Sequence, residues 1–143
     1  MKALWLSIAL ALPVFGSAQV TLDDPGPIVG ARSLALSPDG KWMAYSYRGD
    51  IWVVSSGGGQ SRMLTNHIEM DDVPVWSPDG KWIAFLSNRS GSNDVYIISV
   101  NGGEAKRLTF TSMNETLNDW SPDGKKILFR GYRDLEANGL YEI

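Results

Sequence analysis

The sequence contains no cysteine, only one histidine and, after its first fifteen residues, no long apolar run. Without thiols the chain has neither disulfide bridges nor a cysteine nucleophile. His67 is the only imidazole, and one base without a nucleophile and an orienting group cannot form a catalytic triad. It lies near Glu69, Asp71 and Asp72, where we expect a solvated loop instead of a metal site. The sequence therefore predicts no catalytic residue, no metal site and no cofactor.

Other signatures of chemistry are missing too. There is no Gly-x-Ser-x-Gly elbow, and Gly57–Gly59 lacks the Lys-Ser/Thr and the following helix of a phosphate-binding loop. Thirteen Lys and Arg stand against sixteen Asp and Glu, a net charge of −3, and they form no basic cluster. A mildly acidic chain of this kind is a poor nucleic-acid binder, so we expect no nucleic-acid partner.

The amino terminus has the layout of a secretory signal peptide. Met1-Lys2 is followed by the uncharged run 3–15 and by Gly16-Ser17-Ala18, a small-x-small cleavage site before Gln19. The run is shorter than the about 20 residues that a membrane-spanning helix needs. We expect cleavage between Ala18 and Gln19, export to the periplasm or the cell exterior, and no membrane span in the mature chain. A buried N-terminal strand or helix is the alternative.

One hexapeptide, Ser-Pro-Asp-Gly-Lys-Trp, organises the rest of the chain. Its Pro suits the φ of a type I turn, Asp is tolerated next, and Gly supplies the left-handed residue of a bulged hairpin. We interpret its Asp residues as turn formers, not as metal ligands or catalytic acids. The turn residues are Ser37, Pro38, Asp39 and Gly40; Ser77, Pro78, Asp79 and Gly80; and Ser121, Pro122, Asp123 and Gly124.

The copies begin at Ser37, Ser77 and Ser121, so they lie 40 and 44 residues apart. A period of roughly 40–45 residues is typical of β-propeller blades. Short apolar runs bounded by turn residues fill each period. We therefore predict an all-β fold, an incomplete propeller of about three four-stranded antiparallel blades with the last truncated. The expected segments are a signal peptide at 1–18, an extended lead-in at 19–31, and blades at about 32–66, 72–110 and 116–143.

Blades one and two differ in length at a single loop. Trp42 precedes Asp50 by 8 residues, whereas Trp82 precedes Asp94 by 12, and blade three lengthens the same loop through 132–139. Insertions in one loop class project from one face of a repeat array. The second strands are apolar at consecutive positions, which indicates sheets covered on both faces. We expect four indoles to pack between blades: Trp42, Trp76, Trp82 and Trp120.

The length is too small for a closed ring. Four blades need roughly 160 residues, whereas 143 residues without the 18-residue leader leave 125. Either the chain is part of a longer protein, which we favour, or several copies join into a ring. Because terminal blades expose apolar faces, we expect residues 19–143 alone to be poorly soluble or self-associating.

The repeats at Trp76–Phe85, Asp94–Ile98 and Gly102–Thr109 resemble the WD40-like repeats of TolB-type propellers. Further stretches, Tyr47–Val54 and Lys106–Phe110, resemble the N-terminal propeller of tricorn-like serine peptidases, which carry a tail-specific-protease catalytic domain. TolB proteins place an α/β domain between leader and propeller, and the 18 residues from Gln19 to Ser37 cannot hold one.

The resemblance implies an accessory propeller that guides or gates peptides toward a serine-based site beyond Ile143. A peptide or protein ligand would bind through one propeller face, and the parent's remaining blades would be partners. A TolB-type protein-interaction module without enzymatic activity is the alternative, and a prolyl-oligopeptidase relative is a third. Homo-oligomers stay open as well.

Overall fold

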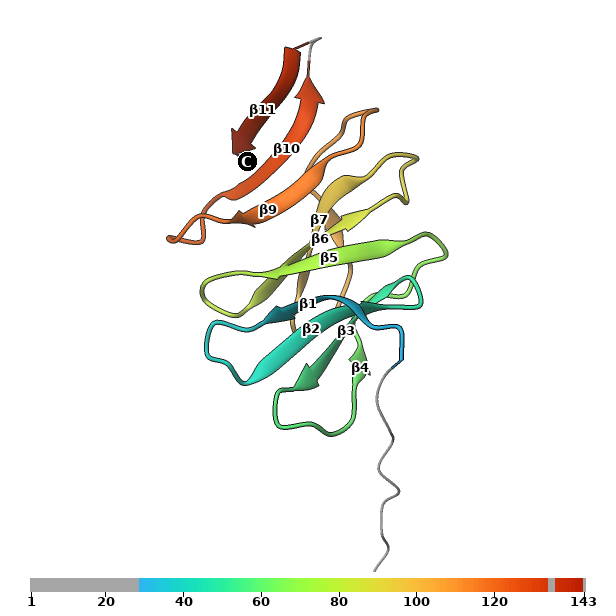
Figure 1. The fold of residues 1–143 in the computed structure, drawn as a ribbon, viewed down its shortest axis with the longest axis vertical. Helices are drawn as coiled ribbons and strands as arrows, with labels where there is room; N and C mark the ends of the chain where they lie inside the picture. Colours follow the sequence, from blue (N-terminus) through green and yellow to red (C-terminus); the bar gives the residue numbers. More distant parts are fainter. Residues whose placement is uncertain (1–28, 134–135, 143) are drawn as a thin grey trace, which may run out of the picture.

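The computed structural model describes residues 29–133 and 136–142, which form three separate antiparallel sheets (Figure 1). Within these ranges there is no helix, so the all-β fold class is confirmed. None of the described residues therefore forms a helix long and apolar enough to cross a membrane. The expected signal peptide and most of the expected lead-in lie outside the described residues.

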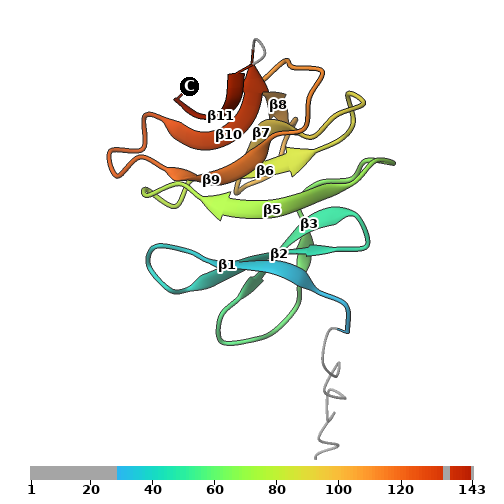
Figure 2. The same ribbon diagram turned by 45° about the horizontal axis from the view of Figure 1, so that its top comes forward.

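Each sheet is a meander of consecutive strands, and the three sheets are stacked (Figures 1 and 2). The first strands of neighbouring sheets, β1 with β5 and β5 with β9, contact each other. These sheets are three successive blades of an incomplete propeller, as the repeat predicted. Their strands are β1 Arg32–Leu36, β2 Trp42–Tyr47, β3 Asp50–Ser55 and β4 Arg62–Met63; β5 Asp71–Trp76, β6 Trp82–Ser87, β7 Asp94–Ser99 and β8 Lys106–Arg107; and β9 Thr116–Trp120, β10 Ile127–Arg133 and β11 Glu136–Glu142.

Two details differ from the sequence-based expectation. The fourth strands β4 and β8 are only two residues long, shorter than a full fourth strand of a blade. Just beyond them, Ile51 N and Val95 N donate to the hydroxyls of Thr65 and Thr109 instead of to a strand carbonyl. In blade three the expected loop 132–139 extends the hairpin instead, with Gly131 opposite Gly139 and Arg133 opposite Glu136. Because the added residues pair with each other, this insertion lengthens two strands.

The core consists of two joints between blades. The first contains Ala44, Ile51 and Val53 of blade one against Ile83, Phe85 and Ile98 of blade two. In the second, Ala84 and Val95 of blade two lie in one cluster with Leu117, Ile127 and Phe129 of blade three. Consecutive residues of β6 thus contribute to both joints, with Ile83 and Phe85 in the first and Ala84 in the second, which explains its continuous apolar sequence.

In blades two and three, one tryptophan side chain each forms a hydrogen bond with the backbone of the preceding blade. Trp76 Nε1 donates to Ala35 O at 3.0 Å, and Trp120 Nε1 donates to Val75 O at 3.2 Å. The expectation for the other two is wrong in part, because Trp42 and Trp82 are 48% and 42% exposed. They begin β2 and β6 at the edge of the joints, where the backbone turn leaves one side of each ring uncovered.

The hexapeptide turns contact each other from blade to blade. A Cβ at Gly80 would lie 4.0 Å from Pro38 Cδ, and one at Gly124 would lie 3.7 Å from Pro78 Cδ. Both glycines have positive φ, 68° and 69°, which the turn requires. The repeated Gly therefore serves the turn and also gives room to the proline of the preceding blade.

Candidate interaction face

The two ends of the blades carry different chain segments. The hexapeptide turns and the β3–β4 and β7–β8 turns lie at one end, which we call the hairpin end. The opposite end, the loop end, carries the β2–β3 turn, the β6–β7 loop at 88–93, and the links between blades at 64–70 and 108–115. Figure 2 shows these loops projecting together past the strands.

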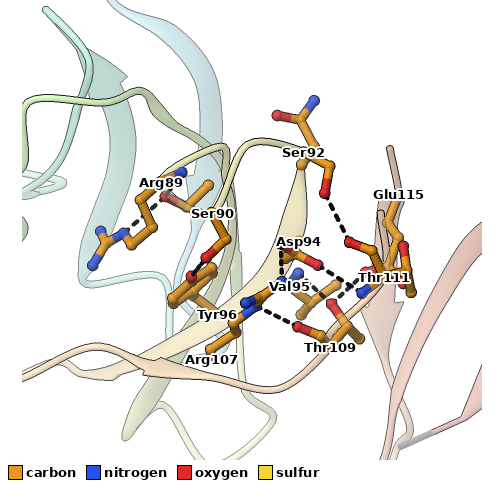
Figure 3. Close-up of polar contacts among 12 residues, drawn as sticks. Arg89, Ser90, Ser92, Asp94, Val95, Tyr96, Arg107, Thr109, Thr111 and Glu115 are labelled. Carbon is orange, nitrogen blue, oxygen red and sulfur yellow. Dashed lines mark hydrogen bonds and ion pairs between the residues drawn. The ribbon is translucent and has the colours of Figure 1, made fainter. Parts of the chain in front are cut away.

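An aspartate at the start of β7 anchors the second link (Figure 3). Asp94 is fully buried and accepts from Arg107 Nη2 at 2.8 Å and from the backbone N of Thr111 at 3.3 Å. Arg107 also donates through Nε to Thr109 O at 2.7 Å. Because a buried carboxylate with charged and backbone donors is costly to break, these bonds stabilise the observed conformation of the link.

Thr109 joins three segments at the centre of this cluster. Its Oγ1 accepts from Val95 N at 2.8 Å and donates to the buried carboxylate of Glu115. Ser92 Oγ donates to Thr111 O at 2.9 Å, and Asn93 N donates to Asn114 Oδ1 at 2.9 Å. The β6–β7 loop and the second link therefore form one hydrogen-bonded unit.

The first link has a simpler anchor. Asp50 Oδ1 accepts from His67 N at 3.1 Å, and Thr65 Oγ1 accepts from Ile51 N at 2.9 Å. His67 Nδ1 accepts from Glu69 N at 3.0 Å, so its imidazole closes a turn. This arrangement uses the only histidine for structure and leaves it without a nucleophile in hydrogen-bond contact.

A second ion pair holds the β6–β7 loop to the first strand of blade two. Arg89 Nη2 donates to both carboxylate oxygens of the fully buried Asp71, at 2.9 and 2.8 Å. Its guanidinium carbon lies 4.8 Å from the ring centre of Tyr96, and Ser90 Oγ bonds to the Tyr96 hydroxyl at 2.8 Å. Buried ion pairs and hydrogen bonds thus hold the segments of the loop end together, and we call these segments the platform.

Four large apolar side chains project from this platform. Ile68 and Met70 on the first link are 96% and 47% exposed, and Phe110 and Met113 on the second are 74% and 50% exposed. The guanidinium of Arg107 packs 4.7 Å from the centre of the Phe110 ring and so supports it from one side. Exposed apolar groups on rigid, polar-rimmed loops are typical of surfaces that bind proteins or peptides.

The sequence-predicted turn residues lie at the opposite, hairpin end. In each copy the serine hydroxyl donates to the aspartate, at 2.7 Å from Ser37 to Asp39 and 2.7 Å from Ser77 to Asp79. These serine bonds, followed by the backbone N–H groups of the next lysines, hold the pKa of Asp39 and Asp79 below the usual value. Ser121 and Asp123 repeat the bond at 2.6 Å. The structure brings the turns of neighbouring blades together but places them away from the loop end.

Metal and catalytic groupings can be judged over the described ranges. There, no three histidine, cysteine, aspartate or glutamate side chains are grouped so that they could hold a metal ion. The fully buried carboxylates of Asp71 and Asp94 are held by arginines. The loop end thus presents exposed apolar side chains on hydrogen-bonded loops, an arrangement suited to contact with a ligand.

Sequence reasoning missed the four apolar residues of the loop end. Each link begins with a Leu-Thr motif, Leu64-Thr65 and Leu108-Thr109, and around His67 the sequence predicts only a solvated loop. The available signal was an isoleucine or phenylalanine placed just after that motif, among polar residues such as Asn66 and Thr111. Leu64 at the start of the first link is buried in the first joint, whereas Ile68 and Phe110 lie beyond the link threonines and are exposed.

Comparison with known proteins agrees with this architecture. Residues 39–142 match the family described as the tricorn protease N-terminal beta propeller domain. The chain belongs to this family. The tricorn-type propeller assignment covers blade one from Asp39 onward and continues through blades two and three to residue 142, and it confirms the resemblance found in the repeats.

Individual proteins that resemble this tricorn-type propeller include one named a peptidase and TolB proteins. The Bacillus subtilis protein named uncharacterized peptidase YuxL is 37% identical over 82 residues, which cover 50% of this chain and 12% of the relative. A TolB structure from Agrobacterium tumefaciens has 33% identity and a TM-score of 0.62, and the match covers 68% of this chain and 36% of that one. The tricorn protease structure, at 20% identity and a TM-score of 0.61, shares the fold over 70% of this chain and 10% of its own.

Proposed function

We propose that the chain is the non-catalytic propeller portion of an exported tricorn-type serine peptidase, and that its loop end binds peptides and guides them toward the catalytic site. The membership of residues 39–142 in the tricorn N-terminal propeller family carries this proposal. The Bacillus relative, itself named a peptidase, agrees with it. Since the chain spans 12% of that relative, the peptidase activity would belong to the rest of the polypeptide.

The loop end supports a binding role because it combines order with exposed apolar surface. Arg89 and Arg107 fix the two loop segments through buried acids. The side chains of Ile68 and Phe110 are already exposed to solvent in this arrangement, so a ligand can contact them without a rearrangement of the loops. A preorganised surface loses little conformational entropy on binding, which favours recognition of flexible peptides.

A second function is supported by the TolB structure from Agrobacterium tumefaciens, at 33% identity over 68% of this chain. In that case the same loop end would bind a folded protein and no peptidase domain would follow. The expected export fits both functions, and the discriminating observation is whether the gene's whole product cleaves peptides.

The test uses the complete gene product with Ile68→Ser and Phe110→Ser introduced together. Each lost apolar contact is worth about 1 to 2 kcal/mol, so we expect KM for a twenty-residue peptide to rise at least tenfold. Hydrolysis of a two-residue chromogenic substrate should stay unchanged, because it is too short to reach from the loop end to the catalytic site.

Met63→Ser is the matched control, since Met63 is 41% exposed on β4, outside the loop end. Equal effects of the control and the double variant would contradict a peptide-guiding loop end. A complete gene product that cleaves no peptide would overturn the peptidase assignment and leave the protein-interaction function.

A further inference from the structure

A groove at the hairpin end runs along the joint between blades one and two. It contains two hollows of about 250 and 240 Å³, and Trp42, Trp76 and Gly80 line both of them. Trp76 is buried with its nitrogen bonded to Ala35 O, whereas Trp42 is 48% exposed between the hollows. The middle of the groove therefore offers a half-exposed indole, an apolar group that the fold leaves accessible.

The outer end of the groove, toward β4, carries a positive charge. Arg62 Nη2 donates to Val100 O at 2.5 Å, and this bond across the joint positions the guanidinium at the outer hollow. A guanidinium has five N–H donors in a planar fork, and the Val100 bond uses one of them. Over the described residues, no carboxylate pairs with Arg62 among the ion pairs, which involve other residues.

The inner end of the groove, toward the hexapeptide turns, carries negative charge. Asp39 and Asp79 line the inner hollow together with Pro38 and Pro78. Their Oδ1 atoms serve the turns, while their Oδ2 atoms lie 3.8 and 3.7 Å from exposed lysine ammonium groups. Such exposed pairs are weak and exchange readily with other cations. The groove thus passes from carboxylates, across an indole, to a guanidinium.

We propose that this groove binds the carboxyl-terminal end of a short, extended peptide. The peptide's α-carboxylate pairs with Arg62, an apolar side chain packs on Trp42, and an ammonium group lies toward Asp39 and Asp79. The charge order of the groove matches a zwitterionic peptide in this direction, and a guanidinium can bind a carboxylate through two parallel hydrogen bonds. Because the groove lies at the opposite end of the blades from the loop end, it does not depend on the function proposed above.

The next joint offers an internal control. Trp82, 42% exposed, repeats Trp42, and Lys106 stands where blade one has Arg62. An ammonium cannot form the two-pronged carboxylate contact of a guanidinium. The first joint is therefore the one fitted for a carboxylate, although both joints offer an exposed indole.

The test titrates the complete gene product, labelled with 5-fluorotryptophan, with the tripeptide Lys-Ala-Leu and follows the fluorine signal of Trp42. The Trp42→Phe variant identifies that signal. We expect a saturable shift, and about tenfold weaker binding of the carboxy-amidated tripeptide and of the Arg62→Gln variant, as the loss of charge-assisted hydrogen bonds implies. Lys106→Gln should leave the affinity within about twofold, since that residue serves the other joint.

Three outcomes would overturn the proposal. These are no saturable shift of the Trp42 signal, equal affinity for the amidated tripeptide, and an unchanged affinity after Arg62→Gln. The Trp76 signal reports whether the joint stays intact in that variant. If the Arg62→Gln variant opens the joint, the proposal is tested on the unmodified protein, by comparing its affinities for the free and the carboxy-amidated tripeptide.

Discussion

Blades one and two share a strand plan but differ in what covers their first strands. In blade one, Leu34 and Leu36 are 65% and 59% exposed. Forty residues later, Pro74 is buried and Trp76 is 8% exposed. Blade two lies between two neighbours, whereas over the described residues blade one has a neighbour on one face. The exposure of a repeat position is therefore set by the adjacent blade as well as by its own sequence.

The same two blades also differ in how they hold the links that follow them. Asp94 of blade two pairs with Arg107, which lies thirteen residues further along the chain. In blade one, the residue thirteen positions after Asp50 is Met63, so the matching ion pair cannot form. Asp50 relies on hydrogen bonds from His67 N and Thr65 Oγ1. A shared anchor position thus carries an ion pair in one blade and neutral donors in the other.

Removing the buried indole of Trp76 should produce the largest difference between the blades in the free energy of unfolding. Trp76→Ala deletes a buried ring and its bond to Ala35 O, and we expect a loss of about 3 to 5 kcal/mol in the free energy of unfolding. Leu36→Ala at the equivalent exposed position should cost less than about 1 kcal/mol. Urea unfolding of both variants, followed by near-ultraviolet circular dichroism, measures the gap. Similar losses would show that blade one is covered in solution.

Neutralising the two anchor residues, Asp94 and Asp50, should produce a smaller difference between the blades in the free energy of unfolding. Asp94→Asn leaves Arg107 without its carboxylate in a partly buried place, and we expect a loss of about 2 to 3 kcal/mol. Asp50→Asn keeps an acceptor for neutral donors and should cost about 1 kcal/mol or less. Arg107→Met gives blade two the residue that blade one has at this position. In that background, Asp94→Asn should cost little more than Asp50→Asn does. The same unfolding measurement applies, and equal costs at Asp50 and Asp94 would contradict the role of the ion pair.

The repeat made most of the fold predictable. Spacing of the Ser-Pro-Asp-Gly turns placed the blades, and apolar runs such as 42–47 and 82–87 coincide with β2 and β6. Such local signals suffice because a hairpin turn and its flanking strands are determined within a few residues. Contacts between blades were harder to predict, because Trp42 and Trp76 look alike in sequence and only the packing separates them.

The acids of the loop end show why the candidate site could not be predicted. Asp71 and Glu115 occupy equivalent positions, and an arginine follows each by eighteen residues, Arg89 and Arg133. The longer acid needs more room, and a Cβ at Gly131 would lie 3.0 Å from Glu115 Cγ, whereas blade two has Ser87 at the matching place. This compensation links residues sixteen positions apart and becomes visible once the strand register is known.

The smallest effect on the free energy of unfolding is expected at Asp72, in the joint between blades one and two. Burial disfavours the charge of Asp72, but hydrogen bonds from Ser33, Val73 N and Ser46, with the charge of Arg32, outweigh it and lower its pKa. A lowered folded-state pKa stabilises the fold above the unfolded value of about 3.9, and this contribution disappears as the pH falls through the folded value.

We therefore expect Asp72→Asn to cost less than about 1 kcal/mol from pH 5 to 7, because the half-exposed carboxylate is screened by solvent. The cost should shrink toward zero in acid, as the unmodified protein loses the same charge. Unfolding curves across this range measure it, with Glu104→Gln in the exposed β7–β8 turn as the control for net charge. A cost independent of pH would mean that the oxygen's hydrogen bonds matter and its charge does not. In that case Asp72 would hold the joint through its hydrogen bonds, without a contribution from its charge.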